Sequence, residues 1–409
     1  MIEKKPRVLL VNDHIGLNGG GDVVFQSEQF YLASLGYEVF LYGWGDDELE
    51  DGNVIICRES ASACDRHLNK FIFASQKRKH FREALRRISP DVIHVHLVSK
   101  YPLAVYPELK GYKVIQTLHG PNLFCATSWG CIKRNSAPCS MGIGFKCYRN
   151  HCVSFPSMML YSLLNVRIKR YLRDYVSCWH CPSRNIYNTA FNLGYKNLVY
   201  IPLGIDECYS QKKDYSNNIK EKNVLFVGAV SKVKGLDYLF EAFKLVKRNV
   251  PDARLIIAGG GDYLSEFSAR VEREVPDGSV EVLGRVPHEK IAQVYKRATV
   301  FAMPSIWQEQ FGLVGPEALA MGIPVVGSNI GGIPEWLHHN EWGYLVPPRD
   351  TRSLADRITT LLNNPDLSYR MGQRGRQFVI NEYSYLQYVH RIELLIRTLY
   401  RGEDYMDNF

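Results

Sequence analysis

The stretch TVFAMPSIWQEQFGLVGPEALA, from Thr299 to Ala320, contains one complete strand–loop–helix unit. Its first five residues form a continuous apolar run, as in strands that are covered on both faces. A helix is expected from about Gly312, and Pro316 is tolerated in its first turn. Similar apolar runs occur before and after this stretch, separated by helical segments. Strands that alternate with helices form a parallel α/β sheet with right-handed crossovers.

The apolar runs fall into two series, and each series predicts one doubly wound sheet. The first series comprises Arg7–Asn12, Glu38–Tyr42, Val54–Cys57, Val92–His96, Val114–Leu118, Ser177–Pro182 and Leu198–Pro202. The second comprises Val224–Val227, Arg254–Ala258, Val280–Leu283, Thr299–Met303, Pro324–Gly327 and Gly343–Val346. The polar stretch Ser210–Lys222 separates them and has the composition of a linker.

The fold class that follows is α/β, with two Rossmann-like domains that face a central cleft. We predict an N-terminal domain at 1–206, a linker at 207–222 and a C-terminal domain at 223–384. The apolar positions of Tyr385–Tyr400 recur at helical spacing. We therefore expect a core-facing helix within 385–409, and one alternative is that it packs back on the first domain.

Length and composition are those of a two-domain globular protein. The chain has 409 residues, of which 46% are apolar and 22% charged, and its formal net charge is +8. These values disfavour long disordered, collagen-like or coiled-coil segments. No apolar run reaches the roughly 18 residues of a membrane-spanning helix, and the start at Met1 shows no signal-peptide cleavage pattern. We therefore expect a cytoplasmic protein.

The ten cysteines all lie at or before Cys208, and five of them fall within 125–152. A cytoplasmic chain keeps its thiols reduced, which disfavours a disulfide framework. The spacing does not match a zinc ribbon, so apolar packing or a local clip is the favoured interpretation. A structural zinc ion is the alternative, and its ligands would be Cys125, Cys139, Cys147 and Cys152.

Three glycine-rich turns follow predicted strands, at Gly16–Asp22, Ala258–Asp262 and Gly331–Glu335. In open α/β sheets, ligands bind at the carboxyl ends of the strands, where loops lead into helices. Glycine lets backbone N–H groups approach an oxyanion closely, and the helix start adds partial positive charge. A single turn of this kind is often only steric, but three of them favour a phosphate-bearing ligand.

The opening stretch also places two carboxylates around a helix start. Glu309 lies in the loop, and Glu317 lies one turn into the helix, where it can accept hydrogen bonds from ribose hydroxyls. The backbone N–H groups of Gly312, Leu313 and Val314 would point at a phosphate. The alternative, that the two carboxylates are only surface charge, is disfavoured by their place at a strand–loop–helix junction.

Three further residues stand near strand ends. Lys234 closes the first strand-to-helix loop of the second domain, where a cation can neutralise a diphosphate, although an isolated lysine is more often only solvated. His119 follows a strand beside Gly120, and we expect it to face the cleft. His94 alternates inward with the core and is interpreted as structural.

Together these motifs resemble the retaining glycosyltransferases of family 4, which have the GT-B fold. The resemblance spans about Arg7 to Asp350 and is most specific at Glu309 and Glu317, with their Phe-Gly interior and Glu-Ala-Leu-Ala tail. The other matching positions are Gly19, Gly20, Gly36, His119, Gly120, Ile201–Asp206, Val227, Gly228, Lys234, Gly235 and Gly331–Glu335. The segment His119–Cys152 is similar to a cysteine-bearing insertion found in a subset of this family.

The resemblance implies transfer of a hexose-type sugar from a UDP- or GDP-sugar to an acceptor hydroxyl, with retention of configuration. It implies two catalytic residues: Glu309, which holds the sugar hydroxyls, and His119, near the anomeric carbon. The residues implied to bind the nucleotide sugar are Gly20, Lys234, Arg285, Phe311, Gly312, Leu313, Val314 and Glu317. Gly21 and Asp22 are predicted on the acceptor side. No cofactor or metal is implied, since the chain lacks the Asp-x-Asp pattern of metal-dependent GT-A folds.

Two positions depart from the family pattern. Ala229 stands where the family usually has an arginine, so one phosphate contact is missing, and Lys232 or Arg285 is a candidate to replace it. Leu203 replaces an asparagine before Gly204, which affects a turn more than the chemistry.

Three other classes of protein are alternatives to this resemblance. A Rossmann dehydrogenase would need Gly-x-Gly-x-x-Gly after its first strand, which Asn18–Asp22 does not provide. A sugar-nucleotide epimerase of the same GT-B shape remains an alternative, because it uses similar phosphate loops. A non-catalytic nucleotide-sugar-binding protein is disfavoured by the intact Lys234, Glu309, Glu317 and His119.

The positive charge is concentrated in the segment 66–88, where eight basic residues accompany the single acid Glu83 and give a net +7. A basic amphipathic helix there would suit an anionic membrane surface, and Met158–Tyr175 has a similar character. We therefore predict a lipid-linked or glycan acceptor in polysaccharide or glycolipid synthesis, a peripheral position at the inner face of the membrane, and no nucleic-acid partner. The alternative is a solvated basic face whose apolar side covers the sheet.

Overall fold

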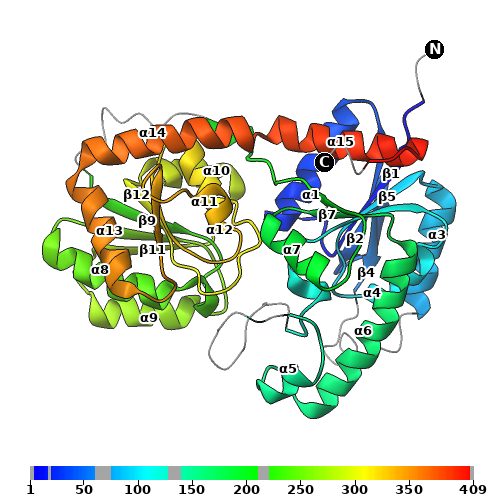
Figure 1. The fold of residues 1–409 in the computed structure, drawn as a ribbon, viewed down its shortest axis with the longest axis horizontal. Coiled ribbons are helices and arrows are strands. Elements are labelled where there is room, and N and C mark those ends of the chain that lie inside the picture. The colour runs from blue at the N-terminus through cyan, green and yellow to red at the C-terminus, as the bar shows by residue number, and fades with distance from the viewer. Residues whose placement is uncertain are drawn as a thin grey trace. The chain divides into compact units, whose positions relative to one another are not determined.

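The computed structural model describes residues 4–16, 20–59, 75–127, 139, 141–210 and 221–405. The chain divides into two compact units: unit 1 holds most residues up to Pro202 together with Leu386 onward, and unit 2 holds Leu203–Tyr385. Each unit is built on a mainly parallel sheet with helices around it (Figure 1). The predicted α/β class with two parallel sheets is confirmed.

Unit 1 contains an eight-stranded sheet in the order β3-β4-β2-β1-β5-β6-β7-β8. The strands are β1 (Arg7–Asn12), β2 (Glu38–Gly45), β3 (Leu49–Asp51), β4 (Val54–Arg58), β5 (Val92–Leu97), β6 (Lys113–Thr117), β7 (Cys178–Cys181) and β8 (Leu198–Tyr200). Neighbouring strands are parallel except for the antiparallel pair β3 and β4. Strand β3 was not predicted, because its three residues are exposed and form no apolar run.

The helices of unit 1 lie around this sheet. They are α1 (Gly20–Ser34), α3 (Ser75–Ile88), α4 (Pro102–Val105), α5 (Phe145–Arg149), α6 (Phe155–Tyr175), α7 (Arg184–Asn192) and α15 (Tyr385–Arg401), with 3-10 turns η1 (Tyr106–Glu108) and η2 (Pro121–Leu123). Helix α15 packs on unit 1: Tyr37 donates a hydrogen bond to Glu393, and Lys113 Nζ donates to the carbonyl of Tyr400 at 2.5 Å. Its buried apolar residues include Val389, Ile392 and Leu395.

Unit 2 contains a six-stranded parallel sheet in the order β11-β10-β9-β12-β13-β14. The strands are β9 (Asn223–Val227), β10 (Arg254–Ala258), β11 (Val280–Gly284), β12 (Val300–Met303), β13 (Val325–Ser328) and β14 (Gly343–Val346). The helical elements are η3 (Glu207–Ser210), η4 (Lys232–Lys234), α8 (Leu236–Asn249), α9 (Leu264–Glu274), α10 (His288–Lys296), α11 (Val314–Ala320), α12 (Ile333–Trp336), α13 (Thr351–Asn363) and α14 (Pro365–Glu382). Each predicted apolar run overlaps one of the observed strands, because these runs are buried on both faces.

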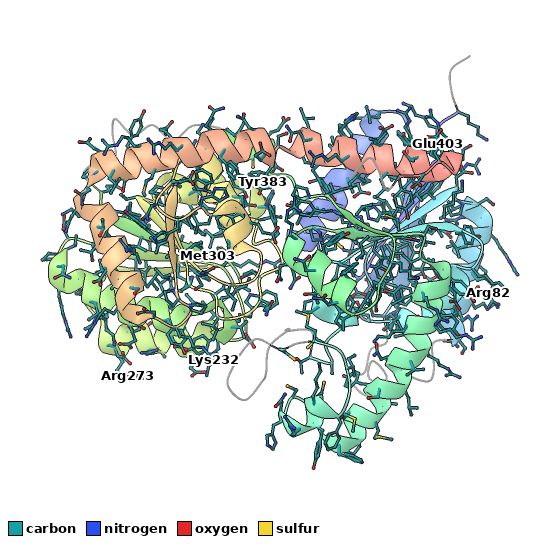
Figure 2. All side chains as sticks on the ribbon, viewed as in Figure 1. Arg82, Lys232, Arg273, Met303, Tyr383 and Glu403 are labelled. Atoms are coloured by element: carbon teal, nitrogen blue, oxygen red, sulfur yellow. The ribbon has the colours of Figure 1, made fainter. Side chains whose placement is uncertain are left out.

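The basic segment 66–88 is described from Ser75, where α3 begins, so its first part lies outside the described residues. The apolar side of α3 is buried in the core of unit 1 through Phe81, Ala84, Leu85 and Ile88. Arg82 Nε donates to Glu108 at 2.7 Å, Arg78 pairs with the same carboxylate, and Arg87 pairs with Glu50. Acids that are distant in the sequence therefore offset part of the local charge, and the count of +7 overstates the charge of this surface (Arg82 is labelled in Figure 2).

Candidate functional site

Glycine turns bring the carboxyl ends of β9 and β10 together in unit 2. A Cβ at Gly259 would lie 1.8 Å from the carbonyl oxygen of Gly228, and one at Gly261 would lie 2.3 Å from that of Val230. Only glycine allows two backbones to approach so closely. The second predicted glycine turn therefore has a steric reason of its own, whether or not a ligand binds there.

Lys234 and Glu309 come from different loops of unit 2 and form an ion pair. Lys234 Nζ lies 2.6 Å from Glu309 Oε1, and the hydroxyl of Ser305 donates to the same oxygen at 2.6 Å. The Glu309 side chain is 4% exposed, whereas that of Lys234 is 22% exposed. An ammonium group has three N–H donors, so Lys234 can bind Glu309 and an anion at the same time.

Glycines shape the loop that holds Glu309. Gly312 has a φ of +80°, and a Cβ there would lie 2.4 Å from the Cε of Met303, at the end of β12 (Figure 2). Gly331 has a φ of +60°, and a Cβ there would lie 2.3 Å from the carbonyl oxygen of Glu309. The N–H of Gly332 donates to that carbonyl at 2.8 Å. The third predicted glycine turn thus supports the backbone of Glu309 directly.

Glu317 lies in the first turn of α11, which begins at Val314 rather than near Gly312. Its Oε2 accepts a hydrogen bond from the hydroxyl of Tyr295 at 2.9 Å. Burial raises the pKa of Glu317 to about 7, although Tyr295 and His288 oppose that rise. At the start of α11 the N–H of Gly315 donates to the carbonyl of Gly312 at 3.0 Å and Pro316 has no N–H, so the predicted backbone donors are those of Gly312, Leu313 and Val314. A carboxylate acceptor and backbone donors therefore occur within one helical turn.

The ring of Phe311 packs in the interior of unit 2, and the predicted role of this residue in nucleotide-sugar binding stays a prediction. Phe311 is 2% exposed, and its ring centre lies 5.3 Å from that of Tyr383. Its carbonyl accepts a hydrogen bond from Trp336 Nε1 at 2.6 Å. The aromatic position before Gly312 thus serves the core of the unit.

Two cationic residues, Lys232 and Arg285, lie near Ala229, which stands where the family usually has an arginine. Ala229 is exposed at the end of β9. Lys232 Nζ pairs with Glu266 at 3.1 Å, so its charge is partly offset. Arg285 is exposed just after β11, and its Cβ would lie 3.5 Å from a Cβ placed on Gly260. Arg285 therefore stands beside the glycine turn that follows β10.

In unit 1, His119 follows β6 and lies against the start of α1. A Cβ placed on Gly21 would lie 3.6 Å from the Cγ of His119. A small cavity next to this ring is also lined by His96, Leu97, Gln116, Gly120 and Asn122. Asp22 is 7% exposed and accepts a hydrogen bond from Asn12 at 2.7 Å, so its carboxylate faces the interior of the unit. Gly20 is the first residue of α1.

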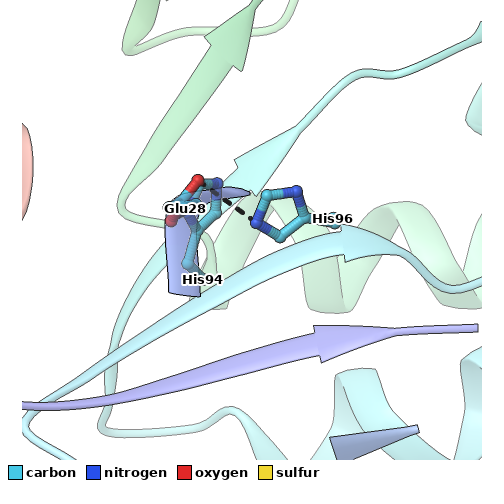
Figure 3. Close-up of side chains that lie close together, drawn as sticks. All are labelled: Glu28, His94 and His96. Carbon is cyan, nitrogen blue, oxygen red and sulfur yellow. Dashed lines mark hydrogen bonds and ion pairs between the residues drawn. The ribbon is translucent and has the colours of Figure 1, made fainter. Parts of the chain in front are cut away.

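A buried network that the sequence analysis missed connects His119 to Glu28 of α1. Nδ1 of His96 lies 3.0 Å from Nε2 of His119, and the two rings are stacked with centres 5.2 Å apart. Glu28 Oε2 lies 3.4 Å from Nε2 of His96, and Glu28 Oε1 lies 2.6 Å from Nδ1 of His94 (Figure 3). The other nitrogen of His94 lies 2.6 Å from the hydroxyl of Thr117. A carboxylate thus orients two histidines, one of which touches His119.

The alternation of His94 and His96 along one strand was a sequence signal for this network, but Glu28 had none. Burial opposes ionisation of Glu28, yet the two histidines lower the pKa of its carboxyl below the ordinary value. Burial lowers the pKa of His119 well below the ordinary value, and the neighbouring histidines add to this effect. His119 is therefore a neutral imidazole at physiological pH.

Two groups of potential metal ligands in the described ranges have their ligand atoms within 4.8 Å of one another: Glu28 with His94 and His96, and Asp206 with Cys208 and His288. In the first group all three residues are buried and already held by hydrogen bonds to protein atoms. In the second, Asp206 and His288 form a pair at 4.0 Å, which raises the pKa of the imidazole. The contacts within each group are explained by pairing between its acidic residue and its histidines, without a metal ion.

Two known protein families together match nearly the whole chain. The family described as Glycosyltransferase Family 4 matches residues 18–207, and the family described as Glycosyl transferases group 1 matches residues 210–378. Among solved structures, sucrose-phosphate synthase from Thermosynechococcus elongatus has a TM-score of 0.74 at 20% identity and covers 98% of this chain and 100% of that one. HepE from Anabaena, solved with UDP and glucose, has a TM-score of 0.71 at 16% identity, with 96% and 100% covered. The GT-B fold is thereby confirmed.

Two relatives of known name are similar to this chain over alignments of different length. N-acetyl-alpha-D-glucosaminyl L-malate synthase from Bacillus anthracis is 25% identical over 325 residues, which is 78% of each chain. A GDP-mannose-dependent alpha-(1-6)-phosphatidylinositol monomannoside mannosyltransferase from Mycobacterium tuberculosis is 34% identical over 152 residues, which is 36% of this chain and 40% of that protein. In the part of the chain that the structure describes, no helix is both long and apolar enough to cross a membrane.

Proposed function

The chain belongs to the family-4 glycosyltransferases of the GT-B fold (glycosyl transferases group 1), and on that premise we propose that it moves a hexose-type sugar from a UDP- or GDP-sugar to an acceptor hydroxyl with retention of configuration. As a member of this family it is a glycosyltransferase that uses a nucleotide-sugar donor. The observation that supports the proposed donor and reaction is the Lys234–Glu309 ion pair of unit 2. Lys234 lies just before α8, and Glu309 lies just before α11.

In the proposed donor site, Lys234 and the backbone N–H groups of Gly312, Leu313 and Val314 hold the diphosphate. The barrier of the reaction lies in separating a cationic sugar from an anionic diphosphate, so preorganised donors around that anion stabilise the transition state. Arg285 supplies the cation that Ala229 does not. Glu317 accepts hydrogen bonds from the ribose, and Glu309 accepts them from the transferred sugar while it neutralises Lys234.

Proton transfer in this proposal requires no dedicated protein base. The bond between the anomeric carbon and the diphosphate oxygen breaks, and the acceptor oxygen bonds to the same face of that carbon. The acceptor proton moves to the departing phosphate oxygen. His119 acts on the sugar as a neutral hydrogen-bond partner, since a cationic imidazole would oppose the growing positive charge on the sugar. Glu28 and His96 are positioning residues that act through His119.

We place the acceptor at a membrane surface because α6 exposes an apolar stripe. Phe155, Met159, Leu163 and Val166 are 49%, 49%, 66% and 69% exposed, and each lies three or four positions after the one before it. Residues with this spacing lie on one face of a helix. The buried residues Ile168 and Leu172 lie on the other side of α6 from this stripe.

The polar surroundings of this stripe suit an anionic lipid surface. Arg170 and Arg173 continue the same helical face, and both are exposed. Helix α5 adds Phe145 and Tyr148 beside the first turn of α6, with ring centres 5.4 Å apart between Tyr148 and Phe155. Figure 1 shows α5 and the first turns of α6 extending beyond the sheet of unit 1. Since the apolar side of α3 is buried, α6 is a better candidate for membrane contact than the described part of 66–88.

The reaction is tested with purified enzyme and UDP- and GDP-sugars. We expect His119→Ala and Glu309→Ala each to lower turnover at least tenfold while the far-UV spectrum stays unchanged, because both contacts strengthen as charge separates. Activity should survive EDTA, and NMR of the new linkage should show the anomeric configuration of the donor. Near-wild-type turnover in both variants would refute the site, and inversion would refute the mechanism.

The acceptor proposal is tested by flotation with liposomes. The enzyme should bind vesicles that contain phosphatidylglycerol, bind less at high salt, and lose binding in Leu163→Glu combined with Val166→Glu. The control combines Lys79→Glu with Arg86→Glu on α3, which removes more positive charge but leaves the apolar stripe intact. Equal partition onto neutral vesicles, or no binding, would indicate an acceptor that is not held at a membrane.

A further inference from the structure

We propose that Cys125, Cys139, Cys147 and Cys152 bind a structural zinc ion that fastens the loop after His119 to the start of α6. All four cysteines line one small cavity in unit 1, together with Phe124, Met141 and Lys146. None of the four is in a disulfide. The sequence spacing alone disfavoured zinc, but tertiary structure brings the four thiols to one place.

The four thiols are neighbours around this cavity. The four sulfurs are not gathered as closely as the two ligand groups described above, all of whose ligand atoms lie within 4.8 Å of one another. Binding would therefore draw the loops inward until each sulfur is about 2.3 Å from the ion.

The backbone around the cavity is already folded into tight turns. The N–H of Gly142 donates to the carbonyl of Phe124 at 2.7 Å, which joins the two sides of the insertion. The N–H of Cys152 donates to the carbonyl of Cys147 at 2.9 Å, and His151 between them has a φ of +54°. These backbone hydrogen bonds hold the turn, and the turn keeps Cys147 and Cys152 close to each other.

The chemistry of the donors selects the ion. Four cysteine sulfurs are a common tetrahedral set for structural Zn²⁺, and each thiol loses its proton to water on binding. Cys125 lies six residues after His119, and Cys152 lies two residues before Ser154, the N-cap of α6. The ion would thus connect the loop of the proposed catalytic histidine to the helix with the exposed apolar stripe. It takes no part in sugar transfer, so its test is independent of the proposed function.

The experiment measures metal content by mass spectrometry after purification without added metal. We expect about one zinc per chain in the wild type and a loss of at least fivefold in Cys147→Ser and in Cys152→Ser. Cys152→His should retain zinc, since imidazole can replace a thiolate. The matched controls are Cys178→Ser, a buried thiol outside the cavity, and Cys208→Ser, from the group with Asp206 and His288.

Three results would overturn the proposal. One is a wild-type protein with little zinc, or with iron in its place. Another is zinc that is lost in Cys208→Ser but kept in Cys147→Ser, which would assign the ion to Asp206, Cys208 and His288. The third is a disulfide among the four cysteines, detected by mass spectrometry of the unreduced protein. If the serine variants do not fold, zinc release from the wild type by a mercurial reagent should parallel modification of four thiols.

Discussion

The two units prepare their candidate sites in different ways. In unit 2, Glu309, Glu317 and the start of α11 belong to one stretch of sequence, and local turns bring them together. In unit 1, His119 is held by His96, which in turn faces Glu28 from a helix 66 residues or more away in sequence. Unit 2 offers a buried carboxylate paired with a partly exposed ammonium group, and unit 1 holds a neutral imidazole by buried polar groups. Changes at Lys234, Glu309 and Glu317 in unit 2 should therefore affect binding of the donor, alone or together with turnover, whereas changes behind His119 should affect turnover alone.

The strongest test of this comparison is Lys234→Ala. The variant removes a cation from the proposed diphosphate site and leaves the carboxylate of Glu309 buried without its partner. We expect kcat/KM to fall at least about a hundredfold, or about 2.7 kcal/mol. The control is Lys232→Ala, which removes a cation two residues away that pairs with Glu266 in solvent and should change kcat/KM less than about twofold. If both lysine variants behave alike, the buried pair is only structural.

The second test uses the pH dependence of donor binding. The raised pKa of Glu317, about 7, means that its carboxyl is mostly ionised at pH 8 and mostly protonated at pH 6. The ionised form accepts hydrogen bonds from ribose, so donor affinity should fall about tenfold as pH falls from 8 to 6. Calorimetry with an intact nucleotide sugar measures this without titration of a terminal phosphate. Glu317→Gln should bind more weakly at pH 8 and lose the pH dependence. An unchanged pH profile in the variant would refute this role.

The smallest expected effect concerns the buried carboxylate of unit 1. Glu28→Gln keeps the shape of the side chain but removes the negative charge that faces both His94 and His96, and one of its two oxygens becomes an amide group that can only donate. We expect kcat to fall about threefold to fivefold with donor KM unchanged, and the nitrogen NMR signals of His119 to shift as its tautomer balance changes. Glu108→Gln, which removes a surface partner of Arg82, serves as the control. A raised KM or unchanged His119 signals would show that Glu28 only stabilises the fold.

Much of the molecule could be predicted from the sequence by itself. The continuous apolar runs predicted the strands of both sheets, because a strand buried on two faces must be apolar throughout. The stretch from Thr299 to Ala320 predicted which unit 2 residues would lie near one helix start, since they are local in sequence. The exposed strand β3 was missed because no burial constrains its composition.

Tertiary structure decided the features that depend on contacts distant in sequence. It buried the ring of Phe311, joined Lys234 to Glu309, and placed Glu108 beside the arginines of α3. It also brought four cysteines to one cavity, although their spacing disfavoured a common site. A residue's own chemistry and its periodicity are present in the linear sequence, so strands, turns and helix starts follow from it. A buried charge or polar group needs an interaction partner. The sequence around it does not specify which distant residue that partner is, because the chain topology decides which residues meet.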